Sequence, residues 1–206
     1  MSPEPDPTAP HLSPASWGEL IDSLDAATIF VVVGGWLGAD ARASVSVEDI
    51  WQETLWMAWR DRHQHEWSGV SRYRSWLLGI ARHRVLDTLR ALGRHKRGGP
   101  AATARFSDLG GPDTVGGMLP ARSTTPSRLA SHVERARTLE RALQSLDPEL
   151  RDVVRLRLFE EVPMTEVAER LSLPLSTAKH RLMRGLQAYR RELERRGGPG
   201  ASIGPS

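Results

Sequence analysis

The chain has 206 residues, a hydrophobic fraction of 39% and a formal net charge of +3, which suits two small folded domains. It has no cysteine, so disulfides, thiolate chemistry and cysteine-ligated zinc fingers are excluded. A pI near 9.9 and the clustering of arginine favour a polyanionic partner over an acidic substrate.

The first 15 residues carry prolines at positions 3, 5, 7, 10 and 14 and predict a disordered tail that is no signal peptide. Ser16 followed by Glu19 has capping-box spacing and predicts a helix to about Leu37, with a weak point at Gly34-Gly35. The apolar run 29–37 is too short to cross a bilayer. We therefore expect no membrane insertion and a cytoplasmic protein.

A second helix is predicted from Ser46 to Arg60, and its residues divide between two faces. The core face holds Ile50, Trp51, Leu55, Ala58 and Trp59. The opposite face holds Asp49, Gln52, Glu53 and Trp56. An exposed tryptophan beside acids indicates a protein partner, although Trp56 packed on a neighbouring helix explains the pattern equally well.

The next stretch is a polar loop from His63 to Gly69, with Trp67 near its middle. His63 and His65, without further ligands nearby, do not predict a metal site, and we expect no cofactor. A third helix is predicted over 72–92, with a core stripe of Leu78, Ala81, Val85, Leu89 and Leu92. Its outer face is basic and includes Arg72, Arg74, Arg82, His83, Arg84 and Arg90. Aromatic residues beside such a stripe are typical of a surface for single-stranded nucleic acid.

Residues 98–127 are rich in Gly, Pro, Ala, Ser and Thr and predict a flexible linker between two lobes. A helix is expected over 129–146. Asp147-Pro148 then supplies an N-cap and a first-turn proline for a helix reaching Phe159.

The stretch 163–196 reads as a helix-turn-helix. Val167, Ala168 and Leu171 form the buried stripe of the first helix, which ends at Ser172-Leu173-Pro174. Ser176 is the expected N-cap of the second helix, whose buried stripe is Ala178, Leu182 and Leu186. Its outward residues are basic, as in a helix that enters the major groove, although a solvated charged helix would share this composition.

Both lobes resemble the bacterial RNA polymerase sigma factors of the extracytoplasmic-function type. Residues 48–54 (EDIWQET) are similar to the helix that binds the polymerase clamp, and residues 73–87 resemble the minus-ten region. Leu146-Asp147-Pro148-Glu149 and residues 176–182 resemble region four, which reads the minus-thirty-five element. Ser172 stands where the family turn often has Gly.

The resemblance implies an all-α protein with two small helical domains. Region 2 would span 16–97 and region 4 would span 129–196, joined by a linker over 98–128, with tails at 1–15 and 197–206. It also implies a non-enzymatic initiation factor that binds core RNA polymerase and promoter DNA, with an anti-sigma factor as a further candidate partner.

Three sets of residues are the expected sites. Core polymerase would bind Asp49, Gln52, Glu53 and Trp56. The minus-ten element would meet His65, Trp67, Arg72, Arg82, Arg84 and Arg90. The upstream element would meet Ser176, Thr177, Lys179, His180, Arg181 and Arg184. For Trp67, stacking on an unpaired base and plugging the loop onto its own helix are both open.

Two other classes of function compete. A stand-alone helix-turn-helix regulator would explain the second lobe but leaves the first without a role. A nucleic-acid-processing enzyme would require clustered carboxylates or a phosphate-binding motif, and the sequence has neither.

Overall fold

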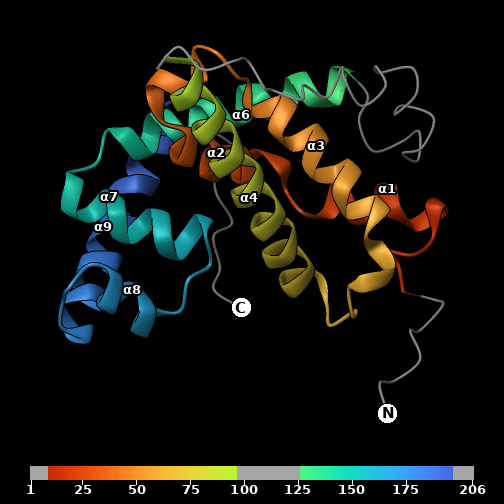
Figure 1. Ribbon diagram of the computed structural model, residues 1–206. Helices are drawn as coiled ribbons and strands as arrows, with labels where there is room; N and C mark the ends of the chain where they lie inside the picture. The colour runs from red at the N-terminus through yellow and green to blue at the C-terminus, as the bar shows by residue number, and fades with distance from the viewer. Residues whose placement is uncertain (1–8, 97–125, 197–206) are drawn as a thin grey trace. The chain divides into compact units, whose positions relative to one another are not determined.

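The computed structural model describes residues 9–96 and 126–196, and every regular element within those ranges is a helix (Figure 1). The all-α prediction is confirmed there. The chain divides into two compact units, residues 1–132 and 133–206. Most of the predicted linker and the predicted tails 1–8 and 197–206 lie outside the described residues.

The first unit begins with two helices, α1 (Pro14–Ser23) and α2 (Ala26–Arg42), where the sequence predicted one. The break falls at Asp25, whose φ of 49° is left-handed, a conformation that aspartate tolerates better than most residues. The Asp25 carbonyl accepts hydrogen bonds from the backbone nitrogen and the hydroxyl of Thr28, at 2.9 and 2.8 Å. The prediction of a weak point at Gly34-Gly35 was wrong, because both glycines lie inside α2.

The residues just before α1 are packed against this unit, which corrects the predicted tail over 9–15. Ala9 and His11 are only 3% and 1% exposed. α1 begins at Pro14 instead of following a Ser16 cap, because proline suits the first helical position, where no backbone donor is needed.

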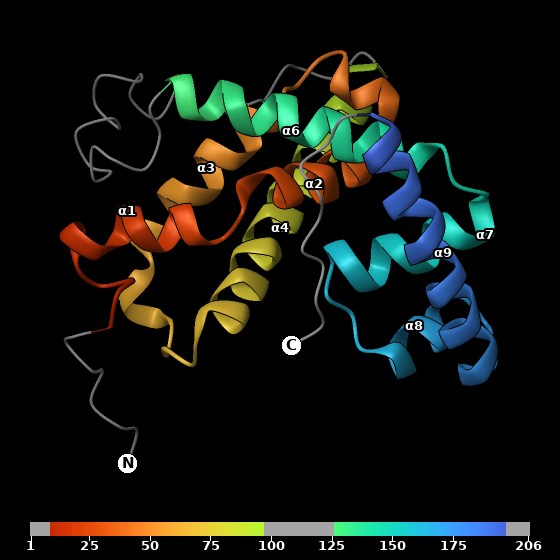
Figure 2. The same cartoon turned by 180° about the vertical axis from the view of Figure 1, so that it is seen from behind.

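The helix α3 (Val47–Arg60) begins where the sequence predicts, and the Ser46 hydroxyl accepts a hydrogen bond of 3.0 Å from the Asp49 nitrogen. All five predicted core residues of α3 are buried. A short 3-10 turn, η1 (Arg62–Gln64), and a loop lead to α4 (Val70–Lys96), which runs antiparallel beside α3 (Figures 1 and 2).

The inner face of α4 is largely as predicted: Leu78, Ala81 and Val85 are buried, while Leu89 and Leu92 are partly buried. Arg74 was predicted on the outer face but is only 6% exposed. Its Nη2 donates to the Thr28 hydroxyl at 3.4 Å, since α2 packs against α4 and covers this turn.

The second unit contains the end of α6 (Pro126–Gln144), then α7 (Pro148–Val154), η3 (Arg155–Phe159), α8 (Met164–Arg170) and α9 (Leu175–Arg195). The helix predicted to reach Phe159 does so, but its last five residues form a π-helix, a form that is rare and often lies at functional sites.

The helix-turn-helix consists of α8 and α9. Its turn places Ser172 at a φ of 53°, the left-handed conformation for which glycine would be the ordinary residue. The prediction of Ser176 as N-cap was wrong: α9 starts at Leu175, because the Pro174 carbonyl already accepts a hydrogen bond from the Ala178 nitrogen at 3.0 Å.

The core of this unit includes Val153, Leu156, Val162 and Val167. α9 packs along α7, and the closest approach is at Gly185. A Cβ there would lie 2.6 Å from the Val154 Cγ2 and 3.3 Å from the Leu150 carbonyl oxygen. This position therefore has room only for glycine.

Among the described helices, none is by itself long and apolar enough to span a membrane. The pair α1 and α2 meets the length and composition test only jointly, across a bend of 69°.

Candidate nucleic-acid interface

The basic face of α9 is open to solvent near the start of the helix. Ser176, Lys179, His180 and Arg184 are exposed, whereas Thr177 and Arg181 are partly buried. Residues three and four apart share a helix face, so Ser176, Lys179 and His180 lie together over the first turns of α9. In a helix-turn-helix, the N-terminal turns of the second helix approach base edges most closely.

Met183 lies on the same face and was missing from the predicted set. Its side chain is 59% exposed, the largest value among the exposed large apolar residues of the described chain. Its spacing from Lys179 and His180 places it one turn further along α9. The sequence analysis did not single it out; its position between the predicted cations His180 and Arg184 was the available signal.

Arg181 pairs with Glu149 at the start of α7. Its Nη2 lies 2.7 Å from the Glu149 Oε2, and the glutamate side chain is 69% exposed. Such an exposed pair contributes only about 0–1 kcal/mol, so Arg181 can exchange this carboxylate for another anion at little cost.

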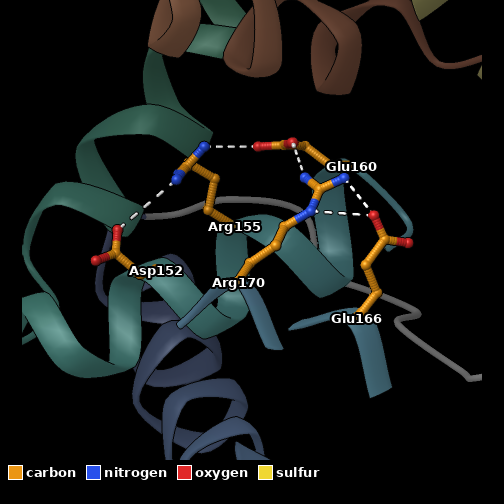
Figure 3. A network of polar contacts seen from close by, with 5 residues as sticks. All are labelled: Asp152, Arg155, Glu160, Glu166 and Arg170. Carbon is orange, nitrogen blue, oxygen red and sulfur yellow. Dashed lines mark hydrogen bonds and ion pairs between the residues drawn. The ribbon is translucent and has the colours of Figure 1, made fainter. Parts of the chain in front are cut away.

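A chain of ion pairs fixes α8 relative to the π-helix (Figure 3). Arg155 donates to the Glu160 carboxylate at 2.6 Å and lies 3.9 Å from Asp152. Arg170 lies 3.9 Å from the other oxygen of Glu160 and donates to Glu166 at 2.6 Å. The Glu160 side chain is only 9% exposed. The network ties the end of η3 to the first helix of the helix-turn-helix.

The predicted minus-ten cations are not equally available. Arg72, Arg82 and Arg90 are exposed along α4, and Arg90 makes an exposed pair of 2.9 Å with Asp87. Arg82 lies 6.0 Å from the ring centre of Trp36 on α2. Arg84, in contrast, is partly buried and paired with Glu53 of α3 at 2.5 Å.

The loop after η1 belongs to an aromatic cluster that sequence reasoning did not predict. His65 stacks on Trp76 at a centroid distance of 4.6 Å, and Trp67 lies 5.8 Å from Tyr73. His11, from the segment before α1, stacks on Trp67 at 5.5 Å with an interplanar angle of 14°. In this structure Trp67 therefore packs against its own chain.

Burial lowers the pKa of the His11 imidazole, although its hydrogen bond to the His65 carbonyl acts in the opposite direction. Burial, followed by repulsion from His11, lowers the pKa of His65. Both shifts favour the neutral imidazole, which stacks on neighbouring rings without the cost of burying a charge.

The residues of the predicted polymerase-binding face of α3 differ in solvent exposure. Asp49 is exposed, while Gln52, Glu53 and Trp56 are partly buried. The Arg60 guanidinium lies 5.0 Å from the ring centre of Trp56 and leaves part of the indole open. Asp49 and Trp56 are thus accessible, and Glu53 is engaged within the unit.

Within the described ranges, no group of three or more His, Cys, Asp or Glu side chains is placed to hold a metal ion.

Two helical units, one with an exposed basic helix-turn-helix and the other with arginines beside an aromatic cluster, define an all-α protein of the nucleic-acid-binding class. Residues 39–95 match the family model of Sigma-70 region 2, and residues 136–188 match that of Sigma-70, region 4. The two matches together span more than half of the chain. The chain belongs to the sigma-70 family and carries that family's regions 2 and 4.

One relative of this type is the ECF RNA polymerase sigma factor SigW of Bacillus subtilis (strain 168), which is 25% identical over 122 residues. The similarity covers 59% of this chain and 63% of SigW, which is less than two thirds of the relative's length.

Proposed function

We propose that this protein is a non-enzymatic transcription initiation factor that binds core RNA polymerase, recognises promoter DNA at two elements and helps to open the strands. Region 2, over 16–97, binds polymerase and the minus-ten element. Region 4, over 129–196, binds the minus-thirty-five element. An anti-sigma factor is the further partner that family membership suggests.

The observation that carries the proposal is the open basic face of α9 in a unit that matches region 4. Lys179 and His180 are the proposed base-reading residues, with Ser176 and Thr177 beside them. Arg181 and Arg184 lie further along the helix and suit contacts to flanking phosphates. Met183 joins this set as an apolar contact, since apolar side chains read the methyl group of thymine.

The exposed arginines of α4 support a backbone-binding role at the minus-ten element. Arg72, Arg82 and Arg90 would hold phosphates, and His65 and Trp67 would meet an unpaired base. Arg84 is assigned a lesser role, because its guanidinium already pairs with Glu53.

Polymerase binding is assigned to the open part of α3. Asp49 and Trp56 would make the main contacts, with Gln52 between them on the same face. Glu53 contributes mainly by holding α3 against α4.

The test is a native gel shift with a random-sequence promoter library, with and without bacterial core polymerase. We expect stable, sequence-specific complexes with duplex promoter DNA only when both proteins are present. Sequence-specific binding by this protein alone, with no change on adding polymerase, would favour a stand-alone regulator.

A further inference from the structure

His11 occupies one face of Trp67, the aromatic residue that we assign to base stacking. The two rings are nearly parallel, at 14°, with centroids 5.5 Å apart, which is the geometry of an offset stack. His11 is only 1% exposed, so the stacked face of Trp67 is closed to solvent. A nucleobase could reach that face only if His11 moved away.

The segment that carries His11 is short. A backbone hydrogen bond of 3.0 Å, from the Leu12 nitrogen to the Ala9 carbonyl, closes its turn, and α1 begins two residues later. The ring is tied to the loop by a 3.0 Å hydrogen bond between its Nε2 and the His65 carbonyl. Among the described residues, this segment, residues 9–12, is held by these two hydrogen bonds and by contacts of the His11 ring with His65, Trp67 and Tyr73; we call it the cover.

The packing around the cover leaves polar atoms unsatisfied. His11 Nδ1, His65 Nε2 and the Tyr73 hydroxyl are buried and find no hydrogen-bond partner among the described residues. A buried polar group without a hydrogen-bond partner destabilises the arrangement that buries it. The closed arrangement is therefore less favourable than its apolar contacts suggest, and a flat ligand with donors and acceptors on its edge suits this place.

We propose that the cover is an autoinhibitory contact, in which His11 holds the place of an unpaired base on Trp67 until single-stranded DNA displaces it. This inference rests on the proposed role of Trp67 at the minus-ten element. A cover that is closed about 90% of the time weakens binding about tenfold, because only the open fraction accepts the base.

The first experiment measures binding of the full chain to a random-sequence single-stranded DNA pool and to a duplex of the same composition. We expect His11→Ala to bind the single strands up to about tenfold more tightly, with duplex binding unchanged. Gln64→Ala is the matched control, since Gln64 is uncharged and exposed in η1, just before the same loop, and should leave both affinities unchanged.

The second experiment reports on the cover itself, using a chain that has no natural cysteine. Ala9→Cys places a thiol in the buried cover, and Ala15→Cys places one on the exposed surface of α1. Single-stranded DNA should speed labelling of the first by a thiol reagent and leave the second unchanged. This reporter retains His11 and does not depend on the folding of His11→Ala.

Two results would overturn the cover. Labelling of Ala9→Cys that stays slow in saturating DNA would mean that the cover does not open. Single-strand binding that is unchanged or weaker in His11→Ala would mean that His11 does not compete with the base. A Trp67→Ala variant distinguishes failure of the cover from failure of the proposed function. If this variant binds single strands as well as the wild type, Trp67 does not stack on a base and His11 has no base to exclude.

Discussion

Glu53 and Arg84 form an ion pair that joins α3 to α4. The Arg84 Nη2 and Nε lie 2.5 and 2.7 Å from the same carboxylate oxygen of Glu53, and both side chains are partly buried. The sequence predicted that Glu53 would bind polymerase and that Arg84 would bind DNA. In the structure the two side chains pair with each other, which favours a role in holding α3 against α4.

The pair predicts a non-additive effect on stability. Glu53→Ala and Arg84→Ala should each lower the free energy of unfolding of the first unit, since each leaves a partly buried charge without its partner. The double variant should lose less unfolding free energy than the two single variants lose together, with a coupling energy of about 0.5–3 kcal/mol. Denaturant unfolding of the four proteins measures this cycle, and strictly additive losses would show that the pair contributes nothing.

Asp49 is predicted to be the acidic contact with polymerase. Asp49→Arg should abolish co-purification with core polymerase and leave the fold intact, because the side chain is exposed and only its backbone nitrogen takes part in the cap. Asp40→Arg, an equal charge change at an exposed residue of α2, is the control. Undiminished co-purification of Asp49→Arg would remove Asp49 from the interface.

Gly185 is predicted to be irreplaceable in α9. Gly185→Ala would force a methyl group against Val154 and the Leu150 carbonyl and should destabilise the second unit by about 1–3 kcal/mol. Gly79→Ala in α4 is the matched control, since no atom lies within 4 Å of its added Cβ. It should stabilise the first unit by about 0.5–1 kcal/mol. Thermal unfolding of both variants tests the contrast, and a neutral Gly185→Ala would disprove the close packing.

Local patterns predicted much of this fold because their causes are local. Ser46 caps α3 from three residues away, and Pro174 ends the turn before α9 whatever packs around it. The break at Asp25 was missed because nothing in its neighbours requires a left-handed residue there. The glycines at 34 and 35 were the more obvious weak point, but both are helical residues of α2.

The site depends more on distant contacts, and less of it could be predicted. The exposed start of α9 follows from helical spacing, so the outward positions of Lys179 and His180 could be predicted. The pairing of Glu53 with Arg84 spans 31 residues, and the hydrogen bond between His11 and His65 spans 54. Periodicity within one helix carries no information on either contact.

The cover is predicted to loosen in acid. The folded structure lowers the pKa of His11 and His65, so the open state binds protons more readily than the closed one. The neutral imidazoles therefore stabilise the closed cover fully above the ordinary histidine pKa of about 6.5. This stabilisation is lost as pH falls toward the lowered pKa values. The titratable groups that act on these pKa values are His63 on His11, and His11 and Glu66 on His65. NMR titration of the imidazole protons measures both values, and a His11 pKa at or above 6.5 would contradict the prediction.

The most direct test of the whole account is run-off transcription from a random promoter library by core polymerase with this protein. The account predicts transcripts absent with core polymerase alone, from templates that share an upstream element. Replacing both Lys179 and His180 by alanine should reduce use of that element about 5–150-fold, the range for 1–3 kcal/mol. Arg190→Ala, an exposed residue further along α9, should leave promoter choice unchanged. The account would be contradicted if this protein bound core polymerase but the mixture made no more transcript than core polymerase alone.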